Sequence, residues 1–100
     1  MNLILTHTDL FLEQVSKLDS KAKEIVKSKI ELIKLNPFRF KRINSTRFNR
    51  VFRVRFNLNG IETRLIYVIF EQKIILVCLF DRAKGYNDLE KMLEKVNKLC

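Results

Sequence analysis

The sequence has little of what loosens or cross-links a chain: among 100 residues there are two glycines, one proline, two cysteines and one histidine. So few glycines and prolines leave little room for linkers, and we expect a single folded domain over residues 1–100. Two cysteines make no disulfide framework, and Cys78, inside an apolar run, is most simply a core residue. A zinc site needs clustered Cys or His ligands, so we expect neither a metal nor another cofactor.

Long apolar runs are also missing. The first ten residues lack the basic leader, the extended apolar stretch and the small-residue cleavage site of a secretory signal. No apolar run approaches the roughly 20 residues that a membrane-spanning helix needs. We therefore expect a cytoplasmic protein that makes no membrane contact.

Acidic residues are absent from one long window of the chain. The sequence carries 20 Lys+Arg against 11 Asp+Glu, a net charge of +9, yet no acidic residue lies between Leu32 and Ile61. Such a field attracts polyanions, which indicates nucleic acid or an acidic protein as the partner. The plainer alternative is a solvated surface. The basic residues of this window, several of them interleaved with phenylalanines, are Lys34, Arg39, Lys41, Arg42, Arg47, Arg50, Arg53 and Arg55.

A β-hairpin is predicted over Val51–Phe70. Two runs of β-branched and aromatic residues flank Asn59-Gly60, a pair that readily adopts the positive φ angles of a two-residue hairpin turn. With that turn, one face of the hairpin is apolar and the other begins as a basic strip. The apolar face comprises Phe52, Val54, Phe56, Leu58, Leu65, Tyr67 and Ile69, and the opposite face comprises Arg53, Arg55, Asn57 and Arg64.

The same register sets Arg55 directly opposite Arg64. Like charges with Cβ atoms about 5 Å apart repel unless an anion lies between them, so this pair predicts an anion-binding position. Two carboxylates provide an alternative account. Glu62, diagonal to Arg55, and Asp81, at the end of the following strand, would neutralise the arginines without any ligand.

The segments around the hairpin predict further elements. A brief strand at residues 3–5 precedes two amphipathic helices, and a tight turn at residues 71–72 precedes a strand at residues 73–80 that is apolar on both sides. In residues 38–50 the apolar side chains recur neither with the 3.6-residue period of a helix nor with the two-residue period of a strand, so this segment is predicted to be an irregular loop. The expected helix boundaries are a cap at Thr8 or Asp9, a second cap at Asp19 or Ser20, a stop at Asn36-Pro37, and a cap at Asn87 for a final helix.

Together these elements predict an α+β fold with the order β-α-α-β-β-β-α. The sheet would be small and antiparallel-rich, with an N-terminal helical hairpin packed on one face. The last helix is the candidate cover for the other face, which carries Ile66, Val68, Ile75 and Val77.

The usual catalytic sets are missing: there is no two-metal carboxylate cluster, no Ser-His-Asp or Cys-His arrangement and no glycine-rich phosphate loop. What remains is arginine, lysine and tyrosine around a basic face. Such a set can bind an RNA backbone, orient a ribose 2′-hydroxyl for attack on its own phosphate and stabilise the phosphorane. Arginine is a poor general base at neutral pH, because its pKa lies above 12.

The whole chain resembles the RelE/ParE toxin superfamily, and RelE-type mRNA interferase toxins most of all. The resemblance implies a RelE-like fold and a toxin that acts as a ribosome-dependent endoribonuclease on mRNA in translation inhibition. It also implies three partners: the ribosome, mRNA and a cognate, acidic, RelB-like antitoxin. The features that carry it are the helical hairpin ending in Leu35-Asn36-Pro37, the strand Phe52–Phe56, the segment Arg64–Tyr67, and Arg82 with Tyr86 ahead of a terminal helix.

The resemblance assigns roles to five residues. Arg64 matches the catalytic arginine that contacts the scissile phosphate, while Arg53 and Arg55 stand where RelE has two lysines. Tyr86 matches the tyrosine that stacks on or activates the substrate nucleotide, the alternative being a ring that packs against the final helix. Arg82 resembles the second catalytic arginine only loosely, because it lies four residues before the tyrosine and not six. With two arginines in place of lysines, the general base is unassigned.

The basic residues ahead of the hairpin are predicted to bind RNA by positioning its phosphates; they are Lys41, Arg42, Arg47 and Arg50. Two other functions stay open. A ParE-like protein would have the same fold and inhibit DNA gyrase by binding, without nuclease chemistry. A plain RNA-binding module, or an inactive relative, would need only the phenylalanine-interleaved basic stretch.

Overall fold

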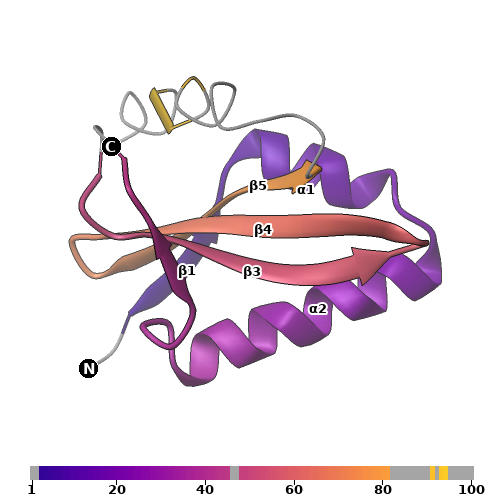
Figure 1. Cartoon of the computed structure of the whole chain (residues 1–100), viewed down its shortest axis with the longest axis horizontal. Coiled ribbons are helices and arrows are strands. Elements are labelled where there is room, and N and C mark those ends of the chain that lie inside the picture. Colours follow the sequence, from indigo (N-terminus) through magenta and orange to yellow (C-terminus); the bar gives the residue numbers. More distant parts are fainter. Residues whose placement is uncertain (1–2, 46–47, 82–90, 92, 95–100) are drawn as a thin grey trace.

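The computed structural model describes residues 3–45, 48–81, 91 and 93–94. Within the first two ranges it has two helices and five strands in one sheet, with the strand order β1-β5-β4-β3-β2 (Figure 1). This confirms the predicted α+β fold. None of the helices in the described ranges is long and apolar enough to cross a membrane. In chain order the elements are β1 (Ile4–His7), α1 (Asp9–Ser16), α2 (Ser20–Leu35), β2 (Lys41–Ile43), β3 (Val51–Leu58), β4 (Ile61–Phe70) and β5 (Lys73–Asp81).

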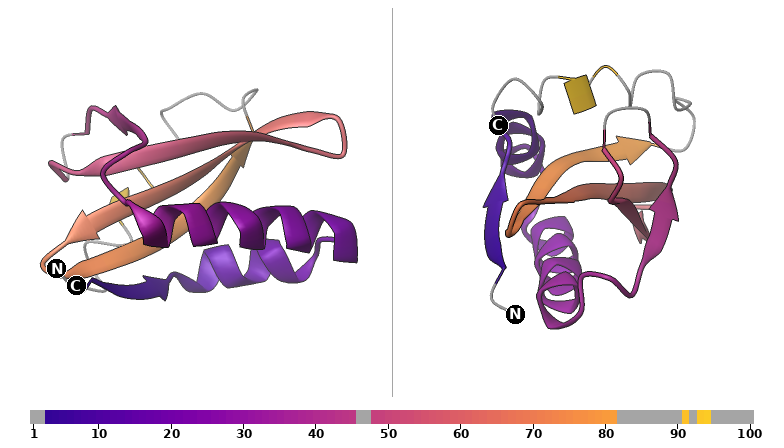
Figure 2. Two further views of the ribbon diagram at one scale, coloured as in Figure 1. Left: turned by 90° about the horizontal axis from the view of Figure 1, so that it is seen from below. Right: turned by 90° about the vertical axis from the view of Figure 1, so that its left-hand side faces the viewer.

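Side-chain caps set the helical hairpin. The Thr8 hydroxyl accepts the backbone N–H of Phe11 at 3.0 Å, and Asp19 accepts that of Ala22 at 2.8 Å, so the predicted caps of both helices are confirmed. Thr8 also donates to the carbonyl of Val77 at 2.6 Å, which ties the start of α1 to β5. Both helices contribute to one core cluster, through Phe11 of α1 and Val26 of α2, and α2 lies against one side of the sheet (Figure 2).

The β3–β4 hairpin has the predicted register. Asn59 and Gly60 have φ angles of 52° and 84°, and Leu58 pairs with Ile61 across the turn. All the predicted apolar side chains of the hairpin pack into the cluster beneath the helices. That cluster also holds buried residues of both helices, including Phe11, Val26 and Ile33.

One feature of the sheet differs from the prediction, and a second was not predicted. Residues 41–43 form β2, which pairs antiparallel with β3, so the irregular loop predicted over residues 38–50 is wrong for this segment. A strand of three residues with one apolar side chain has no readable alternation, and its pairing depends on the exposed backbone of β3. β1 runs parallel to β5, which makes the sheet mixed.

The opposite face of the sheet has a core of its own. Ile66, Val68, Ile75 and Val77 are buried there, and Leu93, which is helical, is fully buried in the same cluster. This agrees with a C-terminal helix over that face, and Figure 1 places the described part of it on the other side of the sheet from α2. The predicted cap at Asn87 and most of that helix lie outside the described residues.

A glutamine side chain extends the edge of β5. β1 pairs only with the first half of β5, through the pair His7 and Leu76. Farther along, the Gln14 amide donates to the carbonyl of Leu79 at 3.0 Å and accepts its N–H at 2.7 Å. One side chain of α1 thus replaces a neighbouring strand at this position.

We expect Gln14→Ala to lower the free energy of unfolding by about 1 to 2 kcal/mol, because both backbone groups of Leu79 lose their partner. Urea denaturation measures the loss. Glu13→Ala is the control, since it removes an exposed pair with Lys17 that contributes at most about 0.5 kcal/mol. Equal losses in the two variants would contradict a structural role for the Gln14 amide.

Candidate nucleic-acid interface

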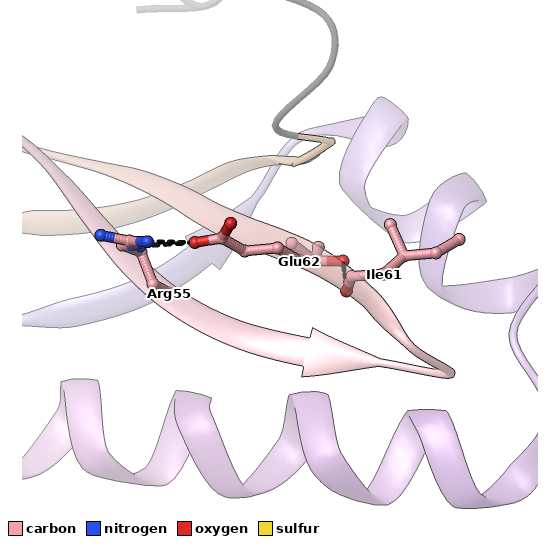
Figure 3. Close-up of polar contacts among 4 residues, drawn as sticks. Arg55, Ile61 and Glu62 are labelled. Atoms are coloured by element: carbon pink, nitrogen blue, oxygen red, sulfur yellow. Dashed lines mark hydrogen bonds and ion pairs between the residues drawn. The ribbon is translucent and has the colours of Figure 1, made fainter.

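Four basic side chains share one face of β2, β3 and β4. Arg55 pairs with Arg64 as predicted, and Arg53 pairs with Lys41 of the edge strand. Directly paired residues of an antiparallel ladder point to the same side, so these four form one surface, which we call the basic face. It lies on the side of the sheet away from α2 (Figure 3).

The arginines of the basic face lie at different depths. Arg53 and Arg64 are half-buried and their Nε atoms are inaccessible to solvent, whereas the Arg55 side chain is 52% exposed. Arg64 pairs with the buried Phe80 of β5, so an apolar layer lies under the charges. A charge at such a boundary acts on an anion through a medium less polarisable than water, which strengthens the attraction.

Cys78 belongs to this apolar layer and not to the reactive groups. It pairs with Ile66 beneath the basic face and is fully buried. Burial raises the pKa of its thiol to about 12, so it stays neutral at physiological pH. This agrees with its predicted place in the core.

Glu62 engages Arg55. Its Oε1 atom accepts the Arg55 Nε–H at 2.9 Å and a second N–H from a terminal nitrogen of the same guanidinium (Figure 3). The two-donor contact has the form in which arginine holds a carboxylate or a phosphate oxygen. The alternative account, in which Glu62 neutralises the arginines, is therefore confirmed for Arg55. Asp81 lies opposite Thr63 at the end of β5.

Two other predicted site residues, Arg42 and Arg50, do not join the basic face. Arg42 pairs with Phe52, which points toward the helices, so Arg42 points to that side as well. The Arg50 guanidinium lies over the Phe38 ring, 5.6 Å from its centre. Arg47, Arg82 and Tyr86 lie outside the described residues.

Tyr67 has the structural role that its position on the apolar face predicts. Its ring stacks on Phe52 with 5.2 Å between centres, and its hydroxyl donates to the Pro37 carbonyl at 2.5 Å. Burial raises its pKa above the ordinary value, so the hydroxyl remains a donor. The tyrosine thereby ties the end of α2 to the sheet.

The basic face can bind an anion and stabilise developing negative charge. In the described ranges, no three His, Cys, Asp or Glu side chains are grouped so as to hold a metal ion. His7, on β1, is separated from β4 by β5. The sequence identified the arginines of the basic face but did not place Lys41 with them, because only the pairing of β2 with β3 brings Lys41 to this face.

Comparison with known proteins gives similarity in fold but not in sequence. No family model and no curated protein matches the sequence. Among solved structures, a double mutant of E. coli toxin RelE in the free state aligns with a TM-score of 0.69 at 17% identity, over 96% of this chain and 99% of that one. The chain therefore has the fold of RelE toxins.

Two complexes extend the likeness. The toxin–antitoxin complex RelBE of E. coli aligns with a TM-score of 0.58 at 15% identity, over 79% of this chain and 95% of that one. The archaeal RelE–RelB complex of Pyrococcus horikoshii OT3 aligns with a TM-score of 0.54 at 12% identity, over 85% of this chain and all of that one.

We expect Glu62→Gln to strengthen the binding of a short single-stranded RNA by up to about fivefold at low salt. The neutral amide no longer competes with phosphate for Arg55, and an exposed ion pair is worth up to about 1 kcal/mol. Fluorescence anisotropy with a labelled RNA measures the change. Glu24→Gln, an equal change of charge on the exposed side of α2, is the control. The same gain in both variants would show a general charge effect and not a local one.

Proposed function

We propose that this chain is the toxin of a type II toxin–antitoxin system and that it cleaves ribosome-bound mRNA. The observation that carries the proposal is the direct opposition of Arg55 and Arg64 on the basic face, within the fold of RelE toxins. Two guanidiniums so placed attract an anion, and the Glu62 carboxylate, which already engages Arg55, shows that the site accepts one. A phosphodiester has the charge and the oxygen geometry to bridge them.

The proposed chemistry needs no metal ion. The ribose 2′-oxygen attacks the adjacent phosphorus, the bond from phosphorus to the 5′-oxygen breaks, and the products are a 2′,3′-cyclic phosphate and a 5′-hydroxyl. Arg55 and Arg64 hold the phosphate and stabilise the extra negative charge of the phosphorane. Arg53, half-buried beside them, adds to the same field. The resemblance supplies the other two roles: Arg82 assists, and Tyr86 stacks on the base.

Proton transfer is the step that the basic face supports least. The 2′-hydroxyl must lose a proton and the departing 5′-oxygen must gain one. Arginine cannot serve as the base at neutral pH. RelE has lysines at two of these positions, so their replacement by Arg53 and Arg55 leaves the general base unassigned.

The proposed partners follow from the charge and from the likeness to two toxin–antitoxin complexes. An acidic antitoxin segment across the basic face would place carboxylates where mRNA places phosphates, and would relieve the repulsion between Arg55 and Arg64 in the same way. Inhibition would then be a competition for one surface. The ribosome would supply the mRNA substrate in the cytoplasm.

Arg64→Ala is expected to abolish ribosome-dependent cleavage. Because Arg64 has a buried Nε atom and faces Arg55, its removal should slow cleavage by at least about 100-fold, the usual loss for one preorganised charge donor. The measurement is mapping of mRNA ends in a reconstituted translation system. Arg64→Lys keeps the charge without the two-pronged geometry and should retain part of the activity.

Lys23→Ala, at the start of α2, removes one positive charge far from the basic face and should cleave at the native rate. Intact mRNA with the native protein would overturn the nuclease proposal, and arrest of DNA gyrase in its place would favour the ParE-like alternative. If the Arg64→Ala variant cleaved mRNA at the native rate, the proposed site would be rejected but the nuclease function would stand.

A further inference from the structure

A second basic surface lies on the other side of the sheet, beyond the end of α2. We call it the Phe38 surface; its members are Phe38, Arg39, Arg42 and Arg50. The Phe38 ring is 44% exposed and meets the buried Phe52 edge-on, with 6.2 Å between ring centres. An aromatic ring held by the core and open to solvent forms a rigid platform.

Aromatic rings and backbone carbonyls hold the arginines of this surface in place. Arg50 lies over Phe38 at 5.6 Å, and Arg39 lies over the half-buried Phe40 at 5.5 Å. Arg42 donates to the carbonyl of Asn49. No carboxylate within the described ranges forms an ion pair with any of the three guanidiniums, so each keeps donors available to an incoming anion.

The sheet separates this surface from the basic face. Alternation along β2 sends Arg42 to the helix side and Lys41 to the opposite side. Arg50 precedes β3, and its guanidinium lies over Phe38, whose ring meets Phe52 on the helix side. The basic window of the sequence is thus divided by the fold into two surfaces. One anion cannot occupy both unless it is a chain that passes around the edge of β2.

We infer that the Phe38 surface is a binding site for single-stranded RNA, separate in space from the basic face. The pairing of exposed ring and guanidinium matches the two components of a nucleotide: a base stacks on the arginine–phenylalanine pair, and the phosphate takes the free donors of Arg39 and Arg42. An acidic peptide would satisfy the charges but has no planar group for the stacked pair. RNA therefore fits more of the surface.

This inference rests on the proposed function only for the source of the RNA, which is either the continuation of the cleaved mRNA strand or a separate ribosomal segment. The two sources share their chemistry, a phosphodiester next to an unpaired base. They differ in reach, since one strand bound at both surfaces must be long enough to pass around β2. Oligonucleotide length therefore tells them apart.

The test measures binding of fluorescein-labelled single-stranded RNA of about four and about twelve nucleotides across a range of salt concentrations, within the site sizes known for single-strand binders. Arg50→Ala should weaken binding through the lost stacking partner, and Arg42→Ala should reduce the slope of log affinity against log salt by about 0.7, the contribution of one phosphate contact. Arg50→Lys should keep the slope and lose about two- to fivefold in affinity, because the charge remains and the stacking does not. Lys23→Ala should retain the native affinity and slope.

An effect of Arg50→Ala on both lengths supports a separate RNA segment at the Phe38 surface, and an effect on the longer RNA alone supports one continuous strand. Native affinity and slope for Arg50→Ala and Arg39→Ala on both lengths would overturn the inference, as would tighter binding of a glutamate-rich peptide than of RNA of equal charge. Thermal denaturation verifies that each variant is folded. The binding test needs neither the ribosome nor cleavage. It can therefore fail while the nuclease proposal holds, and it can succeed when the nuclease proposal has failed.

Discussion

The register of the β3–β4 hairpin is the constraint on which both the core and the candidate interface depend. The turn at Asn59-Gly60 sets Leu58 opposite Ile61, and every later pair follows from that one. A slip of either strand by one residue would turn its arginine, Arg55 or Arg64, toward the apolar cluster and bring the strand's apolar side chains to the other face. Such a change loses apolar burial and desolvates charge at the same time. The pairing of two like-charged residues is therefore imposed by the needs of the core, and an anionic group such as the Glu62 carboxylate reduces the repulsion.

One face of the sheet changes from core to interface along a single strand. On β4, the side chains that point away from α2 run from Val68 and Ile66, both buried, to Arg64 and then Glu62, both half-buried. The buried end packs in the same cluster as Leu93. An irregularity in the β4–β5 pairing at Ile66 shifts the alternation of β5, so that the buried Phe80 comes to lie beside Arg64. The same packing that completes the second core thereby supplies the apolar layer under the arginines.

Sequence patterns predicted the parts of the fold that local chemistry determines. The helix caps at Thr8 and Asp19 and the hairpin turn at Asn59-Gly60 each depend on a few neighbouring residues, and all were correct. β2 and the parallel pairing of β1 depend on backbone contacts between distant segments, which leave no period in the sequence. The candidate site follows the same division. The register fixed by the turn predicted the pairing of Arg55 with Arg64, whereas the separation of Arg42 from that pair depends on β2.

This short edge strand decides how the positive charge of the chain is distributed. In an irregular loop, the basic residues of this window would form one diffuse field that binds any anion. As a strand, β2 directs Lys41 and Arg42 to opposite sides of the sheet, so the charge divides into two surfaces with different neighbours. A small anion can occupy only one of them. A polymer with phosphates along its length can engage both, and each further contact releases counterions and adds to the affinity. On the proposed assignment, selectivity for RNA over small anions comes from this division and not from the net charge.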